Sequence, residues 1–155
     1  MNIRPYHKND KESVIQLVKD GLAEFGFEYA PATSESDLTK IESEYFGNNG
    51  TFLILENDDG QLLAIGAIKE IEGRTFKIRK MYVAKSQRGR GFGKVVLEHL
   101  LSTAKERGAI QVVLETSVWM ASAIGLYEKF GFEKIDGKPS SPRCDLMFAK
   151  KVTDD

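Results

Sequence analysis

Residues 88–94 read Arg88-Gly89-Arg90-Gly91-Phe92-Gly93-Lys94 and lie between a strand-like run and a strongly amphipathic, helix-like run. Three of these residues are glycines, so the backbone N–H groups of the turn can approach a ligand without an intervening side chain. The N-terminal end of a following helix adds unpaired N–H groups and a partial positive charge. The stretch therefore predicts a turn that binds phosphate or pyrophosphate.

The composition limits the class of protein. The chain has 155 residues, of which 41% are hydrophobic and 29% charged, which is ordinary for one globular domain, and we expect a single domain over residues 1–155. A net charge of -1 argues against nucleic-acid binding through bulk charge. Cys144 is the single cysteine, and neither a secretory signal nor a bilayer-spanning run is evident, so we expect a cytoplasmic protein without membrane contact.

The spacing of apolar residues predicts an α+β domain. Two helices are expected near the N-terminus, with capping boxes formed by Asn9 with Glu12 and by Ser34 with Asp37. The expected strands are 2–4, 51–55, 62–71, 75–83, 110–116, 132–135 and 146–150, and the expected helices cover 14–22, 38–45, 95–107 and 123–130.

The strand expected at 75–83 has a regular alternation of side chains. Alternation with a period of two predicts two faces, the first with Phe76, Ile78, Lys80 and Tyr82 and the second with Lys77, Arg79, Met81 and Val83.

Two well-known phosphate-binding loops do not fit the spacing of residues 88–94. A Walker-type loop needs a glycine where Arg88 stands and a Ser or Thr where Val95 stands. A dinucleotide-binding fingerprint needs a glycine where Lys94 stands, and it follows the first strand of a parallel unit rather than a meander. A kinase-like or GTPase-like protein is therefore not expected.

The turn resembles the acetyl-CoA pyrophosphate loop of the GNAT superfamily of N-acetyltransferases. That family's pattern, Gln/Arg-x-x-Gly-x-Gly/Ala, is matched by Arg88, Gly91 and Gly93. Residues 123–132, Ala-Ile-Gly-Leu-Tyr-Glu-Lys-Phe-Gly-Phe, are similar to the family's second signature, Ala-x-x-Leu-Tyr-x-x-x-Gly-Phe. The resemblance covers residues 51–150 well and the first two helices more loosely.

The resemblance implies a three-layer fold and an acetyl-CoA site. The implied central sheet is mixed but mostly antiparallel, splayed between the strands at 75–83 and 110–116 and flanked by helices. The residues implied to bind the cofactor are Met81, Tyr82, Val83, Arg88, Gly89, Arg90, Gly91, Phe92, Gly93, Lys94, Ala123 and Tyr127.

The resemblance also implies acetyl transfer from acetyl-CoA to a primary amine by direct attack. Tyr127 stands at the family's position for the acid that protonates the departing thiolate. The sequence departs from the family's pattern at two positions. Met120 stands where the family often has an asparagine, and Lys77 stands where many members have a carboxylate that serves as general base. Glu115 is our first candidate for the base, followed by Glu70 and Glu28.

The acceptor is expected to be a small amine or an amino-acid-like molecule, because the aromatic loop near Tyr29 and the segment near Trp119 could close a compact pocket. A protein or peptide acceptor, and a non-catalytic acyl-CoA-binding module marked by Lys77, are the alternatives. No cluster of residues has metal-site spacing, so no metal is expected. Homodimers are common among the relatives, which leaves a homodimer as an open expectation.

Overall fold

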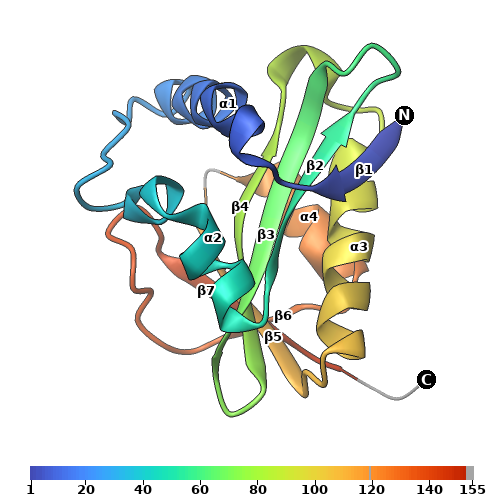
Figure 1. The fold of residues 1–155 in the computed structure, drawn as a ribbon. Helices are drawn as coiled ribbons and strands as arrows, with labels where there is room; N and C mark the ends of the chain where they lie inside the picture. The colour runs from blue at the N-terminus through green and yellow to red at the C-terminus, as the bar shows by residue number, and fades with distance from the viewer. Residues whose placement is uncertain (119, 153–155) are drawn as a thin grey trace.

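A twisted sheet with helices on both faces forms the frame of the protein (Figure 1). The computed structural model describes residues 1–118 and 120–152. In these residues, seven strands pair in the order β1-β2-β3-β4-β5-β7-β6. They are β1 (Asn2–Pro5), β2 (Thr51–Glu56), β3 (Leu62–Glu72), β4 (Thr75–Val83), β5 (Gln111–Thr116), β6 (Glu133–Ile135) and β7 (Leu146–Lys151).

The helices lie where the apolar spacing predicts them, with shifts of a few residues at their ends. They are α1 (Lys11–Ala23), α2 (Ile41–Glu44), α3 (Phe92–Glu106) and α4 (Ala121–Lys129). Four short 3₁₀ helices connect them, namely η1 (Lys8–Asp10), η2 (Ser36–Thr39), η3 (Phe46–Asn48) and η4 (Lys85–Gln87). Helices α1 and α2 cover one face of the sheet, and α3 and α4 cover the other (Figure 1).

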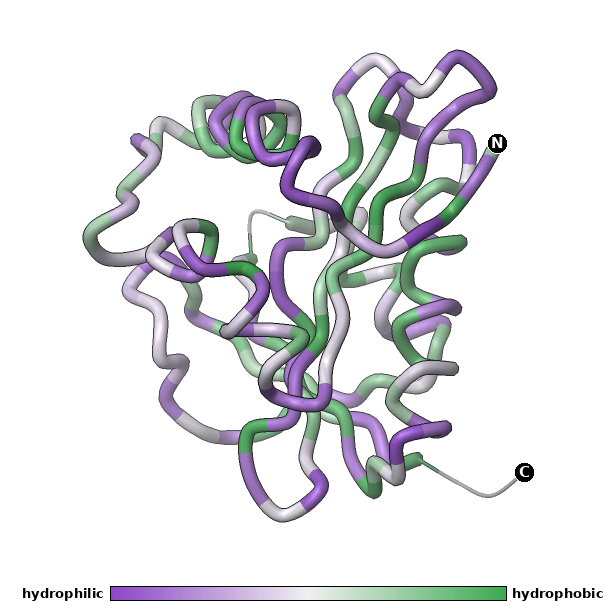
Figure 2. Tube along the Cα trace, viewed as in Figure 1, coloured by the Kyte–Doolittle hydropathy of each residue, from purple (hydrophilic) through white to green (hydrophobic). Residues whose placement is uncertain are grey.

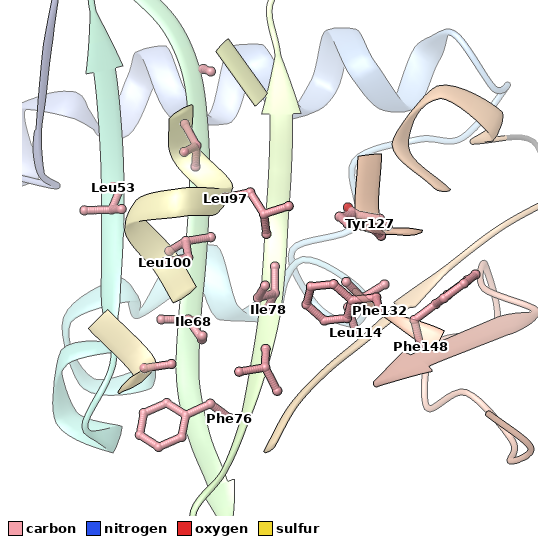
Figure 3. Packing of buried hydrophobic residues seen from close by; sticks show 14 of the residues in the cluster. Leu53, Ile68, Phe76, Ile78, Leu97, Leu100, Leu114, Tyr127, Phe132 and Phe148 are labelled. Atoms are coloured by element: carbon pink, nitrogen blue, oxygen red, sulfur yellow. The ribbon is translucent and has the colours of Figure 1, made fainter. Parts of the chain in front are cut away.

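Each face of the sheet has its own hydrophobic core. Under α3 and α4, the side chains of Leu97 and Leu100 pack on β3 and β4, while Tyr127 packs on Phe132 (Figure 3). On the other face, buried residues of α1 and α2 pack on β2 and β3. Hydrophobic residues follow the central strands and the inner side of α3, whereas connecting loops are largely hydrophilic (Figure 2). Burial of these apolar stripes holds the three layers together.

Strands β4 and β5 separate soon after they meet. They are parallel neighbours over only three residue pairs, from Thr75 opposite Gln111 to Lys77 opposite Val113. Beyond that point β4 stays paired with β3 as far as Val83, and β5 stays paired with β7 as far as Thr116. The expected fold, with a mixed sheet splayed between its two central strands, is confirmed.

A β-bulge in β4 changes the faces that its side chains occupy. Ile65 lies opposite Tyr82 and Ala67 opposite Arg79, so Gly66 faces two residues, Lys80 and Met81. Lys80 adopts a positive φ of 57°, as a bulge residue can. The expectation of an unbroken alternation is therefore wrong after Arg79.

The bulge brings two cations to one face of the sheet. Arg79 and Lys80 both lie toward Asp37, on the side of α1 and α2. Met81 and Val83 turn instead into the core under α3, and Tyr82 packs on the α1 side.

The two expected capping boxes do not form. The actual cap is one turn earlier, where the His7 Nδ1 accepts a hydrogen bond from the Asn9 amide and the Asp10 carboxylate accepts one from the His7 amide. It forms because η1 precedes α1 and turns the chain before the helix begins. Asp37 is buried and accepts a hydrogen bond from the Tyr45 hydroxyl at 2.5 Å, so it is not a cap.

We expect Gly66→Ala to destabilise the fold. A Cβ at Gly66 would lie 2.5 Å from Val96 Cγ1 and 2.8 Å from Met81 Sδ, and overpacking of this kind costs about 1–3 kcal/mol. Gly125→Ala is the matched control, because nothing lies within 4 Å of a Cβ there and alanine favours a helix. Urea unfolding should show a lower midpoint for Gly66→Ala alone; equal midpoints would contradict the close packing opposite the bulge.

Candidate active site

The glycine-rich turn leads from the end of β4 into the N-terminus of α3. After Arg88, which is extended, Gly89 and Gly91 adopt φ values of 81° and 82°, a region that favours glycine. Helix α3 begins at Phe92, and its first i→i−4 bond runs from the Val95 amide to the Gly91 carbonyl. The preceding N–H groups of the first turn are thus available at a helix end that favours anions.

The Arg88 side chain braces this turn against α1. Its guanidinium donates to the Glu24 carboxylate at 2.7 and 3.1 Å, and its Nε lies 3.3 Å from the Val83 carbonyl. In this structure the Arg88 guanidinium is thus engaged by Glu24 and by the Val83 carbonyl. Arg90 and Lys94 are exposed cations of the same turn, and Lys94 lies 3.9 Å from Glu98.

The separation of β4 from β5 leaves backbone groups of β4 without a strand partner on one side. The Ala84 amide donates to the Leu63 carbonyl of β3 at 2.9 Å. Because backbone groups along a strand alternate between its two sides, the amides of Val83 and Met81 face the opening between β4 and β5. This edge ends at Val83, whose carbonyl accepts a hydrogen bond from Arg88 Nε of the glycine-rich turn at 3.3 Å.

Tyr127 of α4 closes the inner end of the opening. It is 7% exposed and packs against Phe132, with ring centroids 5.9 Å apart in an edge-to-face arrangement (Figure 3). Burial raises the pKa of Tyr127 to about 12, and the nearby Cys144 adds to this shift. The hydroxyl therefore keeps its proton throughout the neutral range and can donate it.

A pocket of about 210 Å³ adjoins the opening on the side of α1 and α2. Phe25 and Phe27, from the segment after α1, form part of its wall, and Tyr127 lies at its inner end. The charged side chains that line it are Glu35, Lys77, Arg79, Lys80, Glu115 and Arg143. The pocket thus adds a small, charged chamber to the opening between β4 and β5.

Comparison with known proteins identifies the family. The family model described as "Acetyltransferase (GNAT) family" matches residues 16–132, which is more than half of the chain. The chain belongs to the GNAT acetyltransferase family. This GNAT protein is 26% identical over 151 residues to the Escherichia coli protein called "Uncharacterized N-acetyltransferase YjgM", covering 92% of this chain and 90% of that protein.

A mammalian relative matches over a shorter stretch. The Rattus norvegicus "N-acetyltransferase family 8 member 2" is 31% identical over 111 residues, covering 68% of this chain and 49% of that protein. The match thus spans about half the length of the rat protein.

Solved structures share the fold. A GNAT-family acetyltransferase from Staphylococcus aureus Mu50 superposes with a TM-score of 0.91 at 23% identity, covering 98% of this chain and 99% of that chain. A Salmonella typhimurium acetyltransferase, solved with its cofactor acetyl-CoA, superposes with a TM-score of 0.79 at 17% identity, covering 99% of this chain and 95% of that chain.

Glu115 is fully engaged by its surroundings in this GNAT protein. Its carboxylate accepts hydrogen bonds from Lys77 Nζ at 2.8 Å, from the amide and hydroxyl of Ser140, and from the Ser141 amide. Burial alone would raise the pKa of Glu115, but the hydrogen bonds from Lys77 and Ser140 outweigh it and hold the pKa below its usual value. Lys77 thus neutralises the charge of Glu115.

A second contact holds the segment between β6 and β7 over the pocket. Arg143 donates to both oxygens of Glu35 at 2.8 and 2.7 Å and to the Glu28 carbonyl at 2.7 Å. Its guanidinium also lies 5.1 Å from the centre of the Phe27 ring. Together with the Ser140 contacts, this clamp joins the segment to both walls of the pocket.

The remaining predicted residues are spread around the pocket or away from it. Met120 and Cys144 line the pocket, but Tyr29 does not; its ring instead has Lys19 Nζ at 5.3 Å. Ala123 is half-buried in α4. Glu70 accepts hydrogen bonds from Asn49 and Arg74, near the β3–β4 turn and away from the pocket. Trp119 lies outside the described residues.

Sequence reasoning missed a charged group at the pocket, in which Arg79 and Lys80 line the pocket and Asp37 lies behind them. Regular alternation would place Arg79 and Lys80 on opposite faces of β4, and only the bulge brings them together. The clamp residues Glu35 and Arg143 were also missed, because they are 108 positions apart in the chain. No local sequence signal pairs residues at such a distance.

Two kinds of feature are absent from the described part of the chain. Within residues 1–118 and 120–152, no three His, Cys, Asp or Glu side chains gather into a group that could hold a metal ion. Across the same described ranges, no helix combines the length and apolar character needed to cross a bilayer.

We expect Glu115 to stabilise the fold in a pH-dependent way. Because its pKa is lower in the folded protein than the ordinary value of 4.5, its contribution is complete above about pH 4.5 and is lost as the pH falls through the folded pKa. The loss of stability caused by Glu115→Gln, measured by urea unfolding, should therefore shrink below pH 4.5. Glu128→Gln, on the exposed side of α4, is the control. A difference in unfolding free energy between Glu115→Gln and the wild type that stays constant from pH 3 to pH 7 would contradict a lowered pKa for Glu115.

Proposed function

We propose that this GNAT-family protein transfers an acetyl group from acetyl-CoA to the primary amine of a small or amino-acid-like acceptor by direct attack. The observation that carries the proposal is the meeting of two features at Val83: the open edge of β4, and the glycine-rich turn at the N-terminus of α3. Such a site suits two parts of coenzyme A, its diphosphate and its amide-bearing arm.

The turn would bind the diphosphate, and the β4 edge would bind the pantetheine arm. The amides of residues 88–94 and the helix end supply hydrogen-bond donors, while Arg90 and Lys94 supply charge. Arg88 supports the turn through Glu24. The amides of the arm would pair with Met81 and Val83 as an added strand does, with Tyr82 between them. Ala123 and Tyr127 would face the thioester end from α4.

Transfer requires a new C–N bond and the breaking of the C–S bond. In the transition state the thioester oxygen gains negative charge, and the Val83 or Met81 amide would stabilise it, an effect worth about 10²–10³ in rate. The electron pair of the broken bond leaves with sulfur, and Tyr127 would give that sulfur its proton. The nitrogen of the new amide sheds a proton in the same step, which restores the Tyr127 hydroxyl. Burial raises the pKa of the Cys144 thiol, which disfavours the thiolate that an acyl-cysteine route would need.

Glu115 is the candidate base for removing the proton from the acceptor ammonium. Its lowered pKa makes it a poor final proton acceptor, since proton affinity falls with pKa. We therefore assign Glu115 a supporting part: with Lys77 and Ser140 it holds the wall of the chamber, and the proton of the acceptor ammonium passes to water. Glu35, the other carboxylate that lines the pocket, is held by Arg143 and the Ala30 amide.

The dimensions of the chamber support a small acceptor. Its volume of about 210 Å³ is below the ~300–1,000 Å³ typical of pockets for drug-sized ligands. The hydrogen bonds made by Arg143 and Glu115 hold the segment between β6 and β7, which covers the chamber. A folded protein could not insert more than an extended end into this space.

We expect Gly91→Val to weaken acetyl-CoA binding at least tenfold. Gly91 has a φ of 82°, which a β-branched residue adopts only with strain, so the amides of the turn would lose their arrangement. Isothermal calorimetry with acetyl-CoA measures the change, with Gly125→Ala as a control that should bind normally. Unchanged affinity for Gly91→Val would contradict the proposed diphosphate site.

Turnover separates the enzyme from a non-catalytic module. Thiol release from acetyl-CoA should occur with members of a panel of amines, amino acids and peptides. Acetyl-CoA binding without thiol release on the whole panel would instead support an acyl-CoA-binding module.

We expect Tyr127→Phe to lower kcat more than tenfold with little change in acetyl-CoA affinity, because it removes the proton donor and keeps the ring. The raised pKa of Tyr127, about 12, keeps this proton in place while the acceptor amine, with an ordinary pKa near ~10, loses its own. Wild-type activity should therefore rise with pH through the neutral range. Full activity of Tyr127→Phe in steady-state assays would exclude Tyr127 as the acid.

A further inference from the structure

Arg79 presents a guanidinium to the acceptor chamber without a close counter-ion. Its side chain is 27% exposed and lines the pocket. Its ion-pair contact among the described residues is with Asp37 Oδ2, 4.0 Å from Nη1. That same oxygen accepts a hydrogen bond from the Tyr45 hydroxyl at 2.5 Å, so it is already engaged.

The other oxygen of Asp37 belongs to Lys80. Lys80 Nζ lies 3.2 Å from Asp37 Oδ1, a close ion pair without hydrogen-bond geometry. Both side chains are nearly buried, with exposed fractions of 8% and 1%. Glu44 is also near Arg79 but is paired with Lys69. The two carboxylates near Arg79, those of Asp37 and Glu44, are therefore each paired more closely with a lysine.

The charges at the chamber do not balance in the described residues. Lys77 pairs with Glu115 at 2.8 Å, Arg143 pairs with Glu35 at 2.7 Å, and Lys80 pairs with Asp37. These three pairs account for every carboxylate of the lining and for the one behind it, and Arg79 is the cation that remains. A half-buried, surplus positive charge beside a pocket favours an anionic ligand group.

We propose that the Arg79 guanidinium binds a carboxylate of the acceptor, so that the substrate carries a carboxylate close to the amine that is acetylated. This inference rests on the proposed function and narrows its substrate class to amino acids and related amino carboxylates. The planar guanidinium offers two parallel N–H donors that match a carboxylate. With the carboxylate held by Arg79 on β4, the amine is left on the side of the open β4–β5 edge, where the thioester would lie.

The test compares matched acceptors with the wild-type protein and two variants. The acceptors are L-amino acids and their carboxamides, which differ in charge and little in shape, together with the corresponding aminophosphonates. The variants are Arg79→Gln and Arg79→Lys, and Lys134→Gln on the exposed edge strand β6 is the control. Steady-state thiol release gives kcat and KM for each pair, and urea unfolding confirms that each variant is folded.

We expect the wild-type kcat/KM for amino acids to exceed that for the carboxamides roughly tenfold to a hundredfold, as a charge-assisted hydrogen bond would produce. Arg79→Gln should remove this preference mainly through KM, leave the carboxamides nearly unchanged, and be rescued in part by Arg79→Lys. Lys134→Gln should behave like the wild type. A preference for aminophosphonates over amino acids would overturn the carboxylate assignment.

The failures of the two proposals are distinguishable. Equal turnover of acids and carboxamides by the wild type would overturn the role of Arg79 and leave the acetyltransferase proposal standing. Absence of turnover with every amine would contradict the proposed function. Calorimetric titration of the CoA-bound protein with leucine and leucinamide would then still measure the preference, and equal binding, or none, would overturn this inference as well.

Discussion

The separation of β4 from β5 is the constraint on which the rest of the site depends. Three residue pairs join the two halves of the sheet, β1–β4 and β5–β7, and beyond them each strand follows its outer neighbour. The cost of leaving strand edges unpaired is offset by the core under α3 and α4, whose buried side chains come from both halves of the sheet. The opening then places backbone donors of β4, the Tyr127 hydroxyl and the chamber around one point.

The bulge at Lys80 and Met81 gives the two sides of that opening their different characters. It turns Met81 and Val83 into the core under α3, next to the glycine-rich turn. It also brings Arg79 and Lys80 to the opposite face, beside Asp37. One extra residue in one strand thus separates an apolar, amide-lined side suited to a cofactor arm from a charged side suited to a polar acceptor.

Paired charges arrange much of the chamber without forming part of the expected chemistry. Lys77 lowers the proton affinity of Glu115 while binding it. Glu115 in turn holds Ser140 and Ser141, and Arg143 holds Glu35. Such pairs are expensive to bury unless each carboxylate is well hydrogen-bonded, and here the bonds connect three separate segments of chain.

The sequence alone determined the strands and main helices, the glycine-rich turn and the GNAT family, because periodicity and turn chemistry are local properties that neighbouring residues express together. It misplaced the helix caps and the alternation of β4, where a short 3₁₀ turn and a bulge override the local pattern. Only the tertiary structure decided which side chains share the chamber. Glu35 with Arg143, Lys77 with Glu115 and Arg79 with Asp37 meet across long stretches of chain, and such meetings depend on strand register and packing, which no local spacing encodes.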